Sequence, residues 1–444
     1  MRSTRPVGLS DGDASAIARE VYLYAYPLVL MDVTRCQLTS AGATRLLGAA
    51  PPNRFAHARG LAGPAVRALV RPDVDALASS AWLDLAEEPV VLSLPATERS
   101  FVLTMSSMWS EVFRVLGTRP PGRDTARSFA VVGPRFHDEL PEGLGTIRAP
   151  TRWVWLLGRT PTSGAKDYAN VHAIQDTLSV RPLHAFGSPS EPSRSGAESL
   201  DAVLEPSPPE QVERMSAAQF FARFAELTRD NPPSTSDAAI VARMARLGLR
   251  PGEPFVLARA PAASQAALPG ALRSGLRAIE EGVRRLVGGG RGWELVPPGG
   301  FDERDPLTRA VVARSGLGRS PDVACWVLGV DHQGRPLVGA SRYVLRFASG
   351  EEPPGASWSV TAYDADGFLV PNVLDRYALG DRDAMVRGTD GSLTIELSAD
   401  APAVERANGL PTPRGPFHLV LRVYDPTDAV RSGAWTGPSA IRSV

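Results

Sequence analysis

Residues 71–95 read RPDVDALASSAWLDLAEEPVVLSLP, and this stretch holds the turn and the first strands from which the fold can be inferred. Its short apolar run EEPVVLSLP (87–95) is β-branched and bounded by proline and polar residues, which is typical of a strand in a mostly antiparallel sheet. Two similar runs, FVLTMSSMW (101–109) and TRWVWLLGRT (151–160), follow at short intervals. The N-terminal part of the chain is therefore predicted to be rich in strands.

Helical patterns lie on both sides of this region. Residues 13–34, DASAIAREVYLYAYPLVLMDVT, have apolar side chains at spacings of three and four, and Pro27 is expected to kink this helix or end its first half. After a Pro- and Ser-rich stretch at 187–210, which predicts a linker or surface loop, three further helical patterns occupy 216–233, 236–252 and 269–290. Their predicted buried stripes are Phe220, Phe221, Phe224 and Leu227 in the first, and Leu272, Leu276, Ile279, Val283 and Leu286 in the third.

Strand patterns return near residue 320. Four runs are well formed: RYVLRFA (342–348), WSVTAYD (358–364), SLTIELS (392–398) and FHLVLRVYD (417–425). Alternation in the last run puts Phe417, Leu419, Leu421 and Val423 on one predicted buried face. The expected fold class is therefore mainly β with helices (α+β), with two antiparallel β-sandwich, jelly-roll-like modules. Its expected units are an N-terminal module at 1–186, a linker and helical bridge at 187–320, and a C-terminal β-sandwich at 321–444.

Composition narrows the class of protein. The chain has 444 residues, 43% hydrophobic and 22% charged, which is ample for burial in more than one domain. Its 48 basic residues balance 48 acidic ones, so we expect no nucleic acid and no membrane as partner. No apolar run has the length of a signal peptide or a membrane span, so the expected location is the cytoplasm. The expected partner is a small-molecule substrate, and a homo-oligomer remains possible.

Motifs for metals and cofactors are missing from the sequence. It contains no His-Glu-x-x-His and no Cys-x-x-Cys, and its glycine-rich segment GGGRGW (288–293) lacks the Lys-Ser/Thr pair of a phosphate loop. The two cysteines, Cys36 and Cys325, allow at most one bridge. We therefore expect no metal and no cofactor.

Several segments resemble a known two-module family. YPLVLMDVTR (26–35), NRFAHAR (53–59), residues 71–95 and DYANVHAIQD (167–176) resemble domain of unknown function 1254. The later segments WSVTAYDADGFLVPNVLDRYALGDR (358–382) and GLPTPRGPFHLVLRVYDP (409–426) resemble its partner, domain of unknown function 1214. The resemblance covers most of the chain in the family's order and implies a two-module, β-sandwich-rich protein, while implying little about activity.

The sequence departs from the family pattern at one segment. Where the family usually reads Arg-Pro-Asn-x-Asp-Thr-Leu-Tyr-Ser, this chain has Asp73 for Asn, Ala76 for Thr and Ala78 for Tyr. Three family positions are kept, namely Arg71, Asp75 and Ser79. Two polar side chains have become methyl groups and an amide has become a carboxylate. If this segment lines an active site in the family, the site is altered here and suits a more apolar substrate.

The segment around Asp73 and Asp75 admits two interpretations. Because Arg71 precedes a proline, an extended backbone is expected there, with Arg71, Asp73 and Asp75 on the same side of the chain. In the structural interpretation, Asp75 accepts hydrogen bonds from turn amides and Arg71 pairs with a carboxylate. In the functional interpretation, the three side chains face a cleft near His57, where Arg71 orients an anion and Asp75 acts as a base.

The remaining candidates complete the functional hypothesis. On a helix, Arg54 and His57 would share a face, and histidine is the natural proton shuttle near neutral pH. The predicted catalytic residues are Asp75, Asp73, His57, Arg71 and Arg54, and the predicted substrate contacts are Trp82, Trp109, Ala76 and Ala78. We expect a cofactor-free enzyme, in specialised metabolism, that uses acid/base chemistry for a hydrolysis, elimination or cyclisation of a largely apolar substrate. The alternative is a non-catalytic ligand-binding or assembly protein on the same scaffold.

Overall fold

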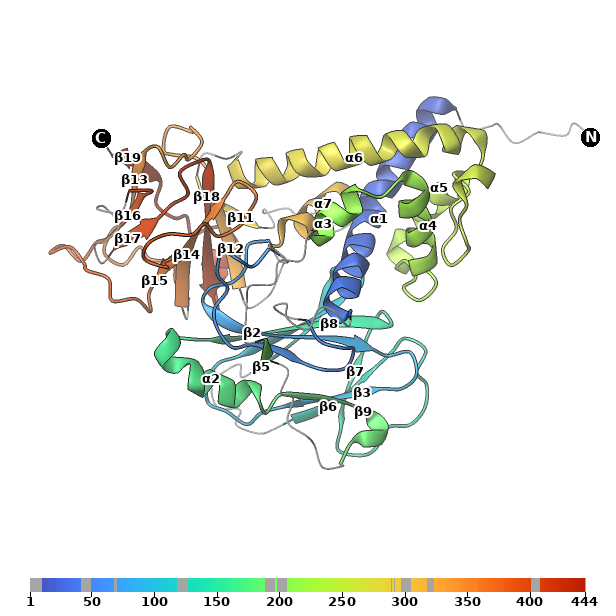
Figure 1. The fold of residues 1–444 in the computed structure, drawn as a ribbon, viewed down its shortest axis with the longest axis horizontal. Helices are drawn as coiled ribbons and strands as arrows, with labels where there is room; N and C mark the ends of the chain where they lie inside the picture. Colours follow the sequence, from blue (N-terminus) through green and yellow to red (C-terminus); the bar gives the residue numbers. More distant parts are fainter. Residues whose placement is uncertain are drawn as a thin grey trace, which may run out of the picture.

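Helix α1 (Asp11–Thr39) runs from the helical part of the molecule to the N-terminal sheet in the computed structural model (Figure 1). Ser10 caps it by accepting a hydrogen bond from the Asp13 N–H at 3.2 Å. The helix continues through Pro27, so the expected early end does not occur. Its middle is buried nearly all round because helices α6 (Ala262–Gly288) and α7 (Pro306–Ser315) pack against it and Trp82 of the N-terminal sheet shares its core.

The structure describes most of the chain. The described residues are 10–40, 49–67, 70–117, 127–187, 196–197, 206–288, 290, 292–296, 305–317, 323–355, 357–400 and 408–443. The expected linker at 187–210 lies largely outside these residues, as does part of the glycine-rich segment at 288–293.

The N-terminal module is a pair of sheets that enclose one core. The larger sheet has the order β10-β1-β2-β8-β4-β5, and the smaller one has the order β7-β6-β3-β9. Their strands are β1 (Ala56–Ala58), β2 (Ala76–Asp84), β3 (Val90–Leu94), β4 (Val102–Ser107), β5 (Val112–Gly117), β6 (Arg127–Val132), β7 (Gly145–Arg148), β8 (Trp153–Pro161), β9 (Ser179–Pro182) and β10 (Gly196–Ala197). Leu83, Leu92 and Leu156 are among the apolar side chains between the sheets. Helix α2 (Tyr168–Gln175) follows β8 in the chain.

The C-terminal module repeats this plan. A sheet of order β11-β12-β18-β14-β15 faces a sheet of order β17-β16-β13-β19. Its strands are β11 (Glu294–Val296), β12 (Val323–Leu328), β13 (Arg342–Phe347), β14 (Ser357–Asp364), β15 (Ala378–Gly380), β16 (Leu393–Ser398), β17 (Gly409–Pro411), β18 (Phe417–Tyr424) and β19 (Ala440–Ser443). The predicted face of β18 is confirmed, since Phe417, Leu419, Leu421 and Val423 are buried in the core of this module. A short helix, α9 (Asp428–Arg431), follows β18.

The helices pack around α1 and extend to the C-terminal module (Figure 1). They are α3 (Pro208–Glu213), α4 (Ala217–Leu227), α5 (Ala238–Arg246), α6 (Ala262–Gly288) and α7 (Pro306–Ser315). The apolar stripe of α4 is buried at its three phenylalanines, which join α1 in one core. Helix α1, placed by the sequence in the N-terminal unit, thus packs largely with the helices of the bridge.

The prediction of a mixed α+β fold with two β-rich modules is confirmed. Most strand pairs are antiparallel, as expected, whereas the pairs β1–β10, β6–β7 and β16–β17 are parallel. A turn follows β14, because the Gly367 N–H donates to the Asp364 carbonyl at 3.1 Å and Gly367 has a φ of 90°.

A close contact between α1 and α6 gives a first testable consequence. A Cβ atom added at Gly275 would lie 2.2 Å from Cδ1 of the buried Tyr22 ring, so Gly275→Ala should lower the free energy of unfolding by about 1–3 kcal/mol. Gly270, in the same helix, has open space at this position, so Gly270→Ala should be neutral or stabilising by about 0.5–1 kcal/mol. Denaturant titration of both variants checks this, and equal effects would contradict the close contact.

Candidate functional site

The predicted segment Arg71-Pro-Asp73-Val-Asp75 enters β2 at the junction of the two modules. The expectation of an extended Arg71 is wrong, because its φ is 53°, in the left-handed region. Its N–H donates to the carbonyl of Gly367, in the turn after β14, at 2.8 Å, and its buried side chain makes further contacts there. These bonds hold a conformation that the residue before a proline normally avoids.

Arg71 is buried and bound to neutral groups of the other module and of α7. Its Nε donates to Nε2 of His418 at 2.9 Å, and its Nη1 donates to the carbonyl of Ser315 at 2.6 Å. Burial lowers the pKa of Arg71 to about 10. Burial also lowers the pKa of His418, as does the charge of Arg71, so the imidazole is neutral and can accept this hydrogen bond. The expected salt bridge of Arg71 is replaced by these contacts.

The two aspartates lie together at the start of β2. Oδ1 of Asp73 accepts the N–H of Asp75 at 2.8 Å, which closes the turn before β2. The hydroxyl of Tyr424 lies 2.8 Å from Oδ2 of Asp75 and 3.2 Å from each carboxylate oxygen of Asp73. Ser359 donates a second hydroxyl bond to the same Oδ2 of Asp75 at 2.5 Å. Asp73 therefore makes the turn, while Asp75 belongs to a polar cluster made with strands β14 and β18.

The electrostatics of this cluster make the two carboxyl groups unequal. Burial raises the pKa of Asp75, and the neighbouring charge of Asp73 raises it further, while Arg382 opposes the shift. Burial together with the two carboxylates also raises the pKa of Tyr424, so its phenol remains a hydrogen-bond donor. A carboxyl group held beside a second one is the arrangement that retains a proton at a higher pH than usual.

Two arginines form the more open side of the cluster. Arg159 Nε lies 3.2 Å from Oδ2 of Asp73, and Arg382 Nη2 lies 3.3 Å from Oδ1 of Asp75. These arginine side chains are 28% and 24% exposed, against 14% for Asp73 and 9% for Asp75. Ala78 is half-buried and lies directly opposite Arg159 in the β2–β8 pair, so its methyl group is on the same face of the sheet. The arginines are thus the more exposed members of the cluster, and a small side chain lies beside Arg159.

A second part of the network fastens the modules together. Tyr363 donates to the carbonyl of Pro72 at 2.7 Å, and Arg422 donates to the Tyr363 hydroxyl at 2.9 Å and to the Arg71 carbonyl at 2.8 Å. Sequence reasoning missed the contributors from β14 and β18. The available signal was a row of polar residues, His418, Arg422 and Tyr424, on the second face of a well-formed strand. A strand with only one buried face would leave these residues in water.

His57 and Arg54 do not share a helical face. His57 is on strand β1, is 1% exposed, and its Nδ1 lies 2.9 Å from the Ser79 hydroxyl. Burial lowers its pKa to about 4, so the imidazole is neutral. Arg54 is exposed in the segment before β1. The described contacts of His57 lie along β1 and β2, and they do not bring it into the cluster of Asp73 and Asp75.

The predicted substrate contacts lie in two environments. Trp82 and Trp109 are buried in the core around α1, where the Trp82 ring stacks on Trp155 at a centroid distance of 5.5 Å. Ala76 is buried at the start of β2, and Ala78 is half-buried as described above. Of these four residues, the alanines are the ones that lie close to the acidic cluster in the chain. The ligand-binding roles of all four remain predictions.

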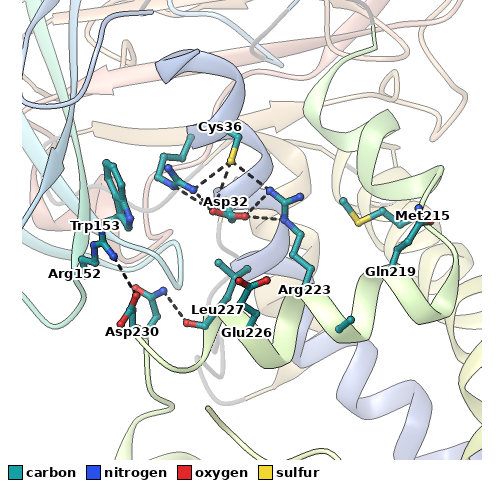
Figure 2. Close-up of a pocket in the computed structure, with 13 residues that line it drawn as sticks. Asp32, Cys36, Arg152, Trp153, Met215, Gln219, Arg223, Glu226, Leu227 and Asp230 are labelled. Atoms are coloured by element: carbon teal, nitrogen blue, oxygen red, sulfur yellow. Dashed lines mark hydrogen bonds and ion pairs between the residues drawn. The ribbon is translucent and has the colours of Figure 1, made fainter. Parts of the chain in front are cut away.

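A cavity of about 710 Å³ lies at the other end of strands β2 and β8 (Figure 2). Its walls come from the end of α1, from α4 and from the start of β8, where Trp153 pairs with Asp84. Strand β2 has nine residues, so about 30 Å separates this cavity from the aspartates that precede the strand. This cavity was not predicted from the sequence, although Asp32 within the apolar run YLYAYPLVLMDVT was an available signal.

The described part of the chain holds no group of three or more His, Cys, Asp or Glu side chains suited to a metal ion. Among the described helices, none combines the length and apolar character that a membrane span requires.

The geometry defines a class: two β-sandwich-like modules joined by helices, with a polar cluster shared at their junction. Family models match in the same places, as "Protein of unknown function (DUF1254)" over residues 52–182 and "Protein of unknown function (DUF1214)" over residues 323–428. The chain therefore belongs to the family that combines these two modules, and the predicted resemblance is confirmed.

One solved structure supports this fold, and a second one is reported for comparison. The VPA0106 protein from Vibrio parahaemolyticus is 21% identical, with a TM-score of 0.65 over 97% of this chain and 100% of its own. An uncharacterised protein from Burkholderia cenocepacia is 12% identical, with a TM-score of 0.46 over 98% of this chain and 95% of its own. At 21% identity, the similarity to the Vibrio parahaemolyticus protein supports the fold and nothing about function. No curated protein matches the chain.

Proposed function

We propose that the protein is a cofactor-free enzyme that acts on a small molecule by acid/base chemistry at the module junction. One observation carries the proposal: Asp75 is a buried carboxyl group whose pKa is raised by burial and by Asp73, and it contacts two hydroxyl groups. Such a group can hold a proton near neutral pH and deliver it, or accept one, in a reaction. Hydrolysis, elimination and cyclisation all need this step.

The neighbouring residues take supporting roles in this proposal. Asp73 adjusts the proton affinity of Asp75, and Tyr424 positions both carboxyl groups through its hydroxyl. Arg159 and Arg382, the more exposed side chains, would stabilise negative charge that develops on a substrate oxygen. Arg71 is a positioning residue, because its guanidinium holds the turn and contacts neither aspartate among the described contacts. The proposal does not use His57 or Arg54.

The residues at the rim of the site indicate the chemical class of the substrate. Ala78 provides a methyl surface where the family usually has tyrosine, and this leaves space beside Arg159 for an apolar group. The two arginines favour an oxygen that carries, or gains, negative charge. We therefore propose a largely apolar substrate with a carbonyl or carboxylate group. Free Cys36 and Cys325 suit a reducing compartment, which supports the proposed cytoplasmic location.

Asp75→Asn tests the chemistry because it keeps the shape of the side chain and removes the titrating group. Turnover should fall by about 10²–10⁴-fold. The free energy of unfolding should be unchanged or slightly higher at neutral pH. The raised pKa makes the folded state hold the proton more tightly than the unfolded state, so this group stabilises the fold at low pH. That stabilisation is lost as the pH rises through the folded pKa.

The measurement is small-molecule profiling of cell extract incubated with the wild type or a variant. The wild type should deplete at least one molecule that Asp75→Asn leaves intact, and Asp428→Asn, at a fully exposed carboxylate, should behave as the wild type. Two results would refute the enzyme: no molecule depleted by the wild type, or a folded Asp75→Asn variant with full activity. An Asp75→Asn variant that unfolds would assign the residue to the structure alone.

A non-catalytic ligand-binding or assembly protein is the second candidate. The observation that favours it is the closed set of bonds among Arg71, Tyr363 and Arg422, which joins the modules and leaves these side chains buried. In that case, the whole junction serves to hold the two modules in one orientation. The profiling experiment separates the two candidates, since only an enzyme depletes its substrate.

A further inference from the structure

The cavity beside α1 and α4 has a positive side. Asp32, which is buried, accepts hydrogen bonds from Arg35 Nη2 at 2.6 Å and from Arg223 Nε at 2.7 Å (Figure 2). Two guanidinium groups around one carboxylate leave one unit of positive charge. The Arg35 and Arg223 side chains are 17% and 34% exposed, so this charge can attract an anionic group in the cavity.

The opposite side of the cavity is negative. Arg152 binds Asp84 at 2.7 Å and Asp230 at 3.2 Å, and the exposed Arg135 also reaches Asp230, at 3.3 Å. Helix α4 adds the exposed carboxylate of Glu226 to the lining, one turn after Arg223 and one turn before Asp230 (Figure 2). Three carboxylates against two guanidinium groups leave one unit of negative charge. The two charged sides therefore differ in sign within one cavity.

Between the charged groups the wall is apolar and rigid. The Arg35 guanidinium lies 4.3 Å from the centroid of the Trp153 ring, and the Arg152 guanidinium lies 5.5 Å from it. Both arginines therefore hold the Trp153 ring in place. Met215 and Leu227 add further apolar surface to the lining. A volume of about 710 Å³ lies within the range that small-molecule sites occupy.

We propose that this cavity binds an amphoteric small molecule. Its anionic group lies at Arg35 and Arg223, its amino group faces Glu226 and Asp230, and its apolar body packs on Trp153. The site is separate from the acidic cluster and about 30 Å away from it along β2. The inference therefore stands whether or not the junction is catalytic.

Cys36 provides the reporter for a test. It is exposed in the cavity wall, with Sγ 3.2 Å from Arg35 Nη2, whereas the second cysteine, Cys325, is buried. Alkylation by iodoacetamide, followed by mass spectrometry, should therefore modify Cys36 selectively in the native protein. The probes are three matched molecules at millimolar concentration: phenylalanine with both charges, 3-phenylpropionate with the anion alone, and phenethylamine with the cation alone.

Phenylalanine should slow the alkylation of Cys36 about threefold more than either single-charge analogue, since it alone engages both sides. Glu226→Gln should remove most of this difference in protection, because it removes a carboxylate that faces the amino group. Arg223→Gln should remove it as well, because it removes a guanidinium that binds the anionic group. The exposed Arg229 lies outside the cavity lining, so Arg229→Gln is the control. This variant should keep the stronger protection by phenylalanine. If Arg223→Gln fails to fold, Glu226→Gln decides the result. Equal protection by all three probes, or none by any, would overturn the proposal.

Discussion

Replacing Arg422 with alanine should lower the free energy of unfolding by about 3–5 kcal/mol. Arg422 is buried at the junction and donates to the Tyr363 hydroxyl at 2.9 Å and to the Arg71 carbonyl at 2.8 Å. Its removal leaves these oxygens without a donor and leaves Asp73 and Asp75 with less positive charge nearby. Unsatisfied buried groups cost more than the bonds that they lose, so the effect should be large.

Denaturant titration of the whole chain measures this effect. Arg342 is the matched control, because its side chain is 54% exposed and pairs with Asp400 at the surface, so Arg342→Ala should change stability by less than about 1 kcal/mol. An Arg422→Ala variant as stable as the control would mean that the junction contributes little to folding. Arg422→Lys should recover only part of the loss, since an ammonium group cannot present the planar fork that serves two acceptors.

Leu421→Ala should lower the free energy of unfolding by about 2–5 kcal/mol. Leu421 is fully buried between the two sheets of the C-terminal module, opposite Trp326 on β12 and Val360 on β14. A cavity in this position has closely packed strands on both sides, so it cannot easily collapse. Ile441→Ala, at a side chain that is 48% exposed, is the control with a small expected effect. An unchanged thermal midpoint for Leu421→Ala would show that this core is loosely packed.

Strand β18 shows how far the sequence predicts the fold. Alternation predicted the burial of Leu419 and Leu421 because a pleated strand places every second residue on one face. The same rule would leave His418 and Arg422 in water, yet both are buried. Local pattern describes one strand and its own module, whereas burial of the second face depends on a segment from another module. The family resemblance supplied both modules without their relative placement.

The candidate site was predicted in part for the same reason. The turn before β2 is local, but Asp73 accepts its backbone hydrogen bond, whereas the structural interpretation gave this role to Asp75. The conformation of Arg71 is set by the Gly367 carbonyl in the other module, and this contact overrides the usual effect of a following proline. His57 was expected near the aspartates, but pairing of β1 with β2 places it beside Ser79. Register between strands decides such positions, and spacing along the chain does not reveal it.

The junction contacts join residues that are far apart in the sequence, and this separation matters while the chain is being translated. The bond between Ser359 and Asp75 spans 284 residues, and the bond between Arg422 and Arg71 spans 351. At about 5–20 residues per second, a nascent N-terminal module waits on the order of tens of seconds before these partners leave the ribosome. During that delay Arg71, Asp73 and Asp75 face water, which solvates them well. A charged junction therefore adds no apolar surface to the half-made protein, where an apolar one would invite aggregation during translation.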